Sequence, residues 1–180
     1  MTGQTASIKL NPKRILIFLL VMVGVIVGLS IWGQKIRFFG IADIRGPWHE
    51  FLLDQLMQNF YLDAEGNITT YINALLLFIP ALLLAAISSW KISVKDKFRF
   101  NWVGLALIFF FLSIDEAAVI HENMIKPMRA IAGAEGFFYF AWVIPGMVIV
   151  AIFGLVYLLF FLHLEEKFKI LFLVSLAVYI

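Results

Sequence analysis

The residues best suited to chemistry in this sequence are acids and histidines that interrupt or border apolar segments. In the most informative stretch, Asp115 and Glu116 interrupt an apolar run, and His121 and Glu122 follow where the run ends. An acid at the centre of a membrane helix costs about 2.5–3.5 kcal/mol on insertion scales, and less toward the membrane edge. Such a side chain faces protein or water and often marks a functional site.

Carboxylates and an imidazole together suit a divalent cation or proton transfer. On a straight helix with about 100° per residue, Glu122 points the same way as Asp115, Glu116 lies on the adjacent flank, and His121 diverges from Asp115 by about 120°. One straight helix therefore does not aim all four side chains at one ion, and other helices have to contribute. In a purely structural interpretation, Asp115 and Glu116 hydrogen-bond across the bundle, for example to Asn73, while His121 and Glu122 lie among the headgroups.

A second histidine–acid pair, His49-Glu50, begins an amphipathic stretch. If the fold brings the two pairs together, they supply enough imidazole and carboxylate ligands for zinc, manganese or iron. In that hypothesis a divalent ion is held by four residues, and either of two glutamates acts as general base on bound water. The ligands are Asp115, Glu116, His121 and His49, and the bases are Glu122 and Glu50. The competing interpretation of His49-Glu50 is an ordinary solvated helix face.

One further acidic stretch, residues 63–67, alternates oxygen-bearing side chains as the opening of an EF-hand loop does. Ile68 then stands where the EF-hand needs glycine, and Ala74 where it needs a bidentate glutamate. We therefore predict a turn that caps the following helix.

The composition indicates the kind of protein that positions these residues. Of 180 residues, 63% are hydrophobic and only 14% are charged, whereas soluble domains carry about 25% charged residues. The mean hydropathy is +0.97. The chain has no cysteine, which excludes thiolate metal sites and disulfides, and its net charge of only +2 gives no support for nucleic-acid binding.

We predict an all-α polytopic transmembrane helix bundle that forms a single membrane domain over residues 1–180. A helix that crosses the hydrocarbon needs roughly 20 apolar residues. Four complete spans are expected at 15–32, 71–90, 102–120 and 137–162. A fifth apolar run, 170–180, is too short to cross, so it is half-inserted or the start of a span in a longer protein. The amphipathic stretch at 47–61 is expected to lie as a helix on the outer surface.

The basic residues predict the orientation, because Lys and Arg concentrate on the cytoplasmic side of membrane proteins. A cytoplasmic N-terminus places nine of the 14 basic residues inside and five outside. The same orientation places nine of the 12 acids, together with His49 and His121, on the outer side or at the outer end of the third span. Any polar chemistry is therefore expected to face outward.

In the first span, Gly24-x-x-x-Gly28 is a signature of close helix packing.

Three strings carry a resemblance to known sequences: Trp-His-Glu at 48–50, Tyr-Leu-Asp-Ala-Glu-Gly-Asn-Ile-Thr-Thr at 61–70, and Leu-Ser-Ile-Asp-Glu-x4-His-Glu at 112–122. Together they resemble uncharacterised bacterial multi-pass inner-membrane proteins, over residues 47–122. This resemblance implies a bacterial inner membrane and no particular activity. The polar residues near helix ends are also loosely similar to the membrane metal-hydrolases that include alkaline ceramidases, but that family's histidine pair near the C-terminus is absent here.

Three functions stay open at the level of the sequence, and with them whether the chain is an enzyme. The first is a non-catalytic subunit or scaffold of a membrane assembly, with the lipid bilayer and other membrane subunits as partners. The second is a metal-dependent hydrolase that acts on a lipid or amphiphile at the outer leaflet. The third is an ion or proton carrier that uses Asp115 and Glu116.

Overall fold

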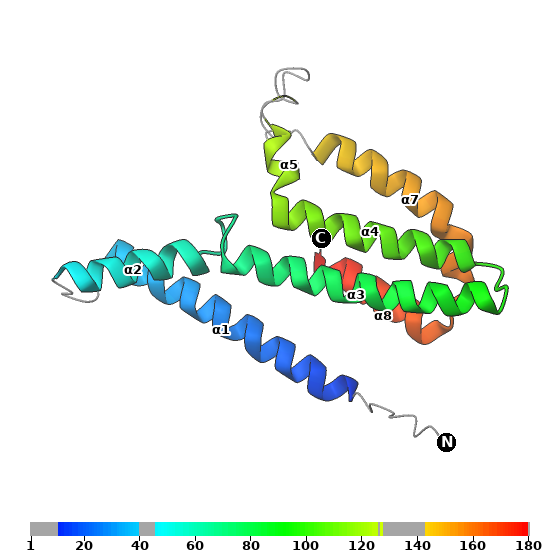
Figure 1. Cartoon of the computed structure of the whole chain (residues 1–180), viewed down its shortest axis with the longest axis horizontal. Helices are drawn as coiled ribbons and strands as arrows, with labels where there is room; N and C mark the ends of the chain where they lie inside the picture. Colours follow the sequence, from blue (N-terminus) through cyan, green and yellow to red (C-terminus); the bar gives the residue numbers. More distant parts are fainter. Residues whose placement is uncertain (1–10, 40–45, 126, 128–142, 180) are drawn as a thin grey trace, which may run out of the picture. The chain divides into compact units, whose positions relative to one another are not determined.

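The structure is a computed structural model that describes residues 11–39, 46–125, 127 and 143–179, and all regular structure in these residues is helical (Figure 1). This confirms the predicted all-α class. The described helices are α1 (Pro12–Phe39), α2 (Pro47–Phe60), α3 (Ile68–Ser93), α4 (Arg99–Ala118), α5 (Ile120–Asn123), α7 (Val143–His163) and α8 (Glu166–Tyr179).

Four of these helices are long and apolar enough to cross a membrane, as predicted. The qualifying segments are Pro12–Ile36, Ile68–Ser93, Arg99–Ala118 and Pro145–His163. Most extend past the predicted apolar runs because flanking polar residues continue the helix, but α4 ends at Ala118, two residues before the predicted end at Ile120. The predicted residues 137–142 of the fourth span lie outside the described residues.

Two further helices, α2 and α8, have 14 residues each and are too short to cross a membrane. The 14 residues of α8 would extend about 21 Å, less than the roughly 30 Å of hydrocarbon. The fifth span therefore stays a prediction. The helix expected at 47–61 is present as α2, with Pro47 in its first turn, whereas its position on the outer membrane surface is untested.

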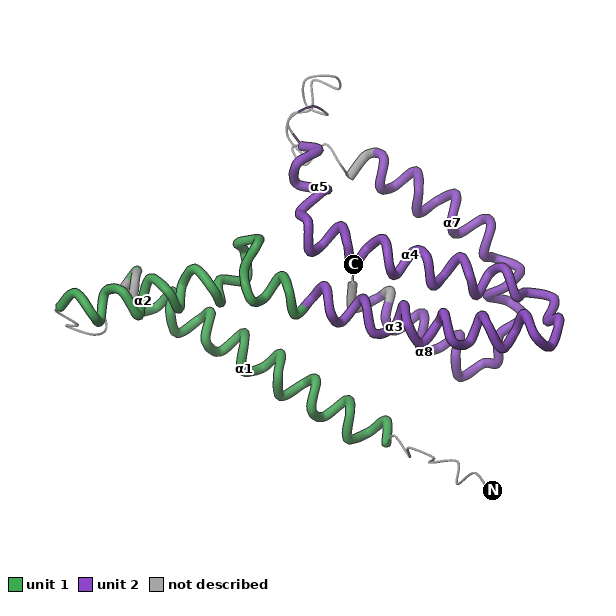
Figure 2. The backbone as a smooth tube through the Cα atoms, in the orientation of Figure 1, with its two compact units in different colours: residues 1–72 green, residues 73–180 purple. Residues whose placement is uncertain are grey.

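The chain's contacts divide it into two compact units, residues 1–72 and residues 73–180 (Figure 2). The single membrane domain expected over 1–180 stays a prediction. In the first unit, α1 packs against α2 where Gly33 meets Met57 and Leu56. A Cβ atom at residue 33 would lie 2.7 Å from Met57 Sδ, so a larger residue here would push the flexible ends of Met57 and Leu56 aside. Ser30 adds a polar contact, because its Oγ accepts a 3.3 Å hydrogen bond from the main-chain N–H of Leu62.

The turn before α3 is built around Asn67, which is only 6% exposed. Its Nδ2 donates to the carbonyls of Tyr61 and Ala64 at 2.8 and 2.9 Å. Its Oδ1 accepts from the main-chain N–H of Thr70 at 3.0 Å, which is the geometry of a helix N-cap. The predicted capping turn is thus confirmed.

In the second unit, short contacts join α3, α4 and α7. Ser113 Oγ on α4 donates a 2.8 Å hydrogen bond to the main-chain carbonyl of Ala74 on α3. Tyr157 Oη on α7 donates a 3.0 Å hydrogen bond to the carbonyl of Asn101. The ring of Trp102 meets that of Phe160 edge to face, with centroids 5.1 Å apart. These contacts hold the two ends of α4 and so position the polar residues at both ends.

Candidate functional site at the end of α4

The polar cluster at the C-terminal end of α4 is shaped by a helix break at Val119. This residue has φ 54° and ψ 39°, the left-handed conformation, and its N–H donates to the carbonyl of Asp115. Left-handed backbone costs an ordinary residue about 1–2 kcal/mol, and it is most unusual for a β-branched one. The short helix α5 then starts in a new direction at Ile120 (Figure 1).

The break brings His121 back onto Asp115. The main-chain N–H of His121 donates to Asp115 Oδ1 at 3.0 Å, and the ring Nδ1 lies 2.9 Å from Asp115 Oδ2. Both side chains are largely buried, with 21% of His121 and 19% of Asp115 exposed. The expectation that His121 diverges from Asp115 by about 120° is therefore wrong, because the segment is not one straight helix.

Glu116 makes the cross-helix contact that the structural interpretation anticipated. Its Oε1 accepts a 3.3 Å hydrogen bond from Asn73 Nδ2 on α3. This bond lies near the buried Ser113–Ala74 hydrogen bond between the same two helices. Asp115 and Glu116 thus serve different contacts: Asp115 fixes α5 against α4, and Glu116 joins α4 to α3.

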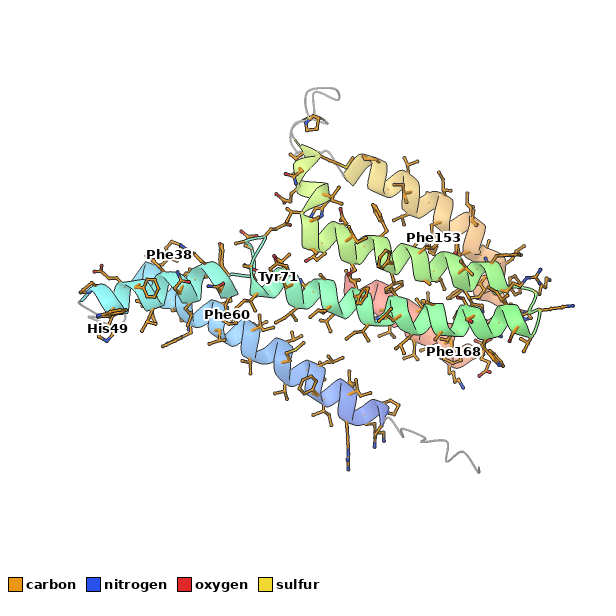
Figure 3. All side chains as sticks on the ribbon, in the orientation of Figure 1. Phe38, His49, Phe60, Tyr71, Phe153 and Phe168 are labelled. Atoms are coloured by element: carbon orange, nitrogen blue, oxygen red, sulfur yellow. The ribbon has the colours of Figure 1, made fainter. Side chains whose placement is uncertain are left out.

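The other predicted site residues lie at exposed positions. Glu122 follows His121 on α5 and is exposed. His49 and Glu50 are exposed in the first turn of α2, in the first unit (Figure 3). A joint metal site of His49 with His121 stays a prediction, as do the general-base roles of Glu50 and Glu122.

The Asp115–His121 pair has a defined chemical capacity. A carboxylate that binds one ring nitrogen fixes the tautomer and orientation of the imidazole, an arrangement found both at metal-bound histidines and at general bases. The neighbouring Glu122 adds a carboxylate, so an imidazole and acidic oxygens lie together at this end of the second unit, a ligand set that divalent cations accept.

A second polar cluster, at the N-terminal end of α4, was missed by the sequence reasoning. Lys91 Nζ forms a 2.8 Å ion pair with Asp96 Oδ2. The Lys91 hydrogen bond, followed by one from the Phe98 main-chain N–H, lowers the pKa of Asp96 below its ordinary value. The His163 ring, at the end of α7, lies 4.9 Å from the Phe98 ring. The four basic residues between positions 91 and 99 were the available signal, but they were used only to predict orientation.

Comparison with known proteins assigns a family without an activity. No curated protein and no solved structure matches this chain. One family model matches residues 15–180, and its description is "Domain of unknown function (DUF8692)". The match covers the clusters at both ends of α4 and all four candidate spans except the first three residues of the first span. The chain is therefore a membrane protein that belongs to the DUF8692 family of unknown function.

Proposed function

We propose that this chain is a non-catalytic subunit or scaffold of a membrane assembly, in which the acids near the membrane edge shape and join helices. The observation that carries the proposal is the hydrogen bonding of Asp115, whose two carboxylate oxygens both accept from His121. Glu116 adds a contact between helices through Asn73. Because an acid is expensive in a membrane, contacts of this kind give these residues a structural reason to be there.

Open helix surfaces support the subunit role. Only 11% of the apolar window of α1 is buried by the described residues. Cβ atoms built on Gly24 and Gly28 of α1 would meet nothing within 4 Å among the described residues. Small residues at this spacing let two membrane helices approach closely. We infer that this face of α1 packs against another membrane subunit.

The proposed location is a bacterial inner membrane with the N-terminus in the cytoplasm, supported by the distribution of basic residues. Because the chain has no native cysteine, single cysteines report topology directly. We expect an impermeant maleimide to label Asp63→Cys in intact spheroplasts, and Lys95→Cys only after permeabilisation. The reverse pattern would show that the proposed orientation is inverted.

The subunit proposal is tested on the full chain purified in a mild detergent. Native mass spectrometry should find the 20.5 kDa chain in a larger complex, and Gly28→Leu should reduce that complex by blocking close approach at α1. Gly154→Leu is the matched control, because Gly154 is also a helical glycine with open space around it, but on α7. A monomer in both the wild type and the control would contradict the subunit role.

A metal-dependent hydrolase acting on a lipid or amphiphile is the second candidate, and the orientation of His121 by Asp115 favours it. In this candidate His121 is a ligand, Asp115 orients its ring, and Glu116 or His49 adds a further ligand, while Glu122 or Glu50 activates water. Stoichiometric metal that His121→Ala removes from a folded protein would establish a metal site. An ion or proton carrier has less support, because the other three predicted complete spans contain no charged residue in the sequence.

A further inference from the structure

An open pocket of about 300 Å³ lies in the second unit, between the N-terminal end of α4 and the last turns of α7. Its lining joins two kinds of side chain. Lys97 and His163 provide nitrogen groups, and Phe98, Leu159 and Leu162 provide apolar surface. A pocket that is basic on one side and apolar on the other matches an amphiphile with an anionic head.

The aromatic ring of Phe98 organises the polar half of this pocket. Lys97 Nζ lies 5.2 Å from the Phe98 ring centroid, and the His163 ring centroid lies 4.9 Å from it. Phe98 also packs against Phe160, with ring centroids 5.8 Å apart, and Phe160 is only 4% exposed. Phe98 therefore contacts both the buried Phe160 and the two nitrogen-bearing groups.

The charge around the pocket is positive. Asp96 is the acid nearest in sequence; it is paired with Lys91 at 2.8 Å and also lies near enough to His163 to attract it. Among the described residues, Lys95, Lys97 and Arg99 form no ion pair. The acids at the start of α8 are matched by its lysines, in the pairs Lys167–Glu165 and Lys169–Glu166. The N-terminus of α4 adds the positive end of a 20-residue helix with no side-chain cap.

We propose that this pocket binds the headgroup phosphate of an anionic phospholipid, with Lys97 and His163 beside the phosphate and an acyl chain along Leu159 and Leu162. Basic pockets between membrane helices are known to bind phosphate-bearing lipid headgroups. Free phosphate shares the head chemistry but makes no contact with Leu159 and Leu162, the apolar half of the lining, which are 71% and 57% exposed to other ligands. A lipid covers both halves. This inference goes beyond the proposed function and does not depend on it.

The test titrates the purified full chain in dodecyl maltoside with dioleoyl phosphatidylglycerol or dioleoyl phosphatidylcholine and counts bound lipid by native mass spectrometry. We expect phosphatidylglycerol to bind more tightly. Lys97→Ala should weaken the binding of phosphatidylglycerol about fivefold, the factor expected for one basic residue near an anionic surface. It should leave the binding of phosphatidylcholine unchanged. Lys97→Arg should preserve the preference. Lys95→Ala is the matched control, because Lys95 lies in the same turn and does not line the pocket.

Two further arms separate the sources of the phosphate and the kind of binding. Inorganic phosphate should compete only weakly with phosphatidylglycerol. Leu159→Asn should weaken the binding of phosphatidylglycerol and leave the competition by phosphate unchanged. Equal losses for Lys95→Ala and Lys97→Ala would overturn the pocket in favour of diffuse surface charge. Full displacement of the lipid by inorganic phosphate at similar concentration would overturn the lipid identity. Elution volume and circular dichroism establish that each variant is folded.

Discussion

Substitution of Asp115 by asparagine should destabilise the protein by about 2–5 kcal/mol, the value of two bonds to a charged group less one neutral bond. The carboxylate accepts two hydrogen bonds from His121, at 3.0 and 2.9 Å, and bonds to a charged group are worth about 1.5–3 kcal/mol each. Asparagine keeps one acceptor for the main-chain N–H, as a neutral bond of about 1 kcal/mol. Its amide N–H₂ then faces the ring Nδ1, which accepts only if the ring proton moves to Nε2.

The assay is reversible unfolding of the purified chain in mixed micelles with increasing dodecyl sulfate, followed by circular dichroism. Asp54→Asn is the control, because Asp54 is exposed on α2 and its side chain forms no hydrogen bond among the described residues. A double-mutant cycle with His121→Ala isolates the pair and should give a coupling of about 1–3 kcal/mol. A coupling near zero, or equal losses in Asp115→Asn and Asp54→Asn, would refute the structural role of Asp115.

Three further predictions concern other features of the fold. Gly104→Ala should cost about 1–3 kcal/mol, because a Cβ there would strike Tyr157 Oη. The same substitution should cost less in a Tyr157→Phe background, because the clashing oxygen is gone; an unchanged cost there would contradict the close approach. Val119→Gly should leave the free energy of unfolding unchanged or raise it by up to about 1 kcal/mol, because glycine adopts positive φ without strain; a clear loss of stability would argue against the left-handed break. The Lys91 hydrogen bond lowers the pKa of Asp96 below its ordinary value of 3.8. The ionised Asp96 therefore stabilises the fold at neutral pH, and this contribution is lost as the pH falls from 3.8 through the lower pKa of the folded state. The stability difference between wild type and Asp96→Asn should shrink over that range, and a constant difference would contradict the ion pair.

The four candidate spans were predictable because their identification depends on length and hydropathy alone. Apolar runs near 20 residues must cross as helices, since hydrocarbon leaves no other partner for the backbone. The turn before α3 was predictable for a local reason as well, because Asn67 can cap a helix with its own side chain. The contact between Glu116 and Asn73 was anticipated as one option, since an acid in a membrane needs a polar partner.

The geometry of the site was not predictable, because it depends on a local conformation that the residue type disfavours. Val119 stands in an apolar run that continues into Ile120, with no glycine, proline or asparagine to indicate a break. The left-handed turn at Val119 is what directs His121 toward Asp115. The pocket near Phe98 was missed for a different reason, because Lys97 and His163 are 66 positions apart in sequence and meet only through the packing of α7 on α4.

We propose that Asp115 and His121 hold the end of α4 and do not serve a metal-dependent reaction. The most direct test measures metal in the full chain, purified without chelator and re-equilibrated with zinc, manganese and iron, by mass spectrometry. The Asp115→Asn/His121→Ala double variant is measured beside it. We expect no stoichiometric metal in either protein and a lower free energy of unfolding in the variant. About one equivalent of metal per wild-type chain, absent from a folded variant, would contradict it and establish the metal-dependent alternative.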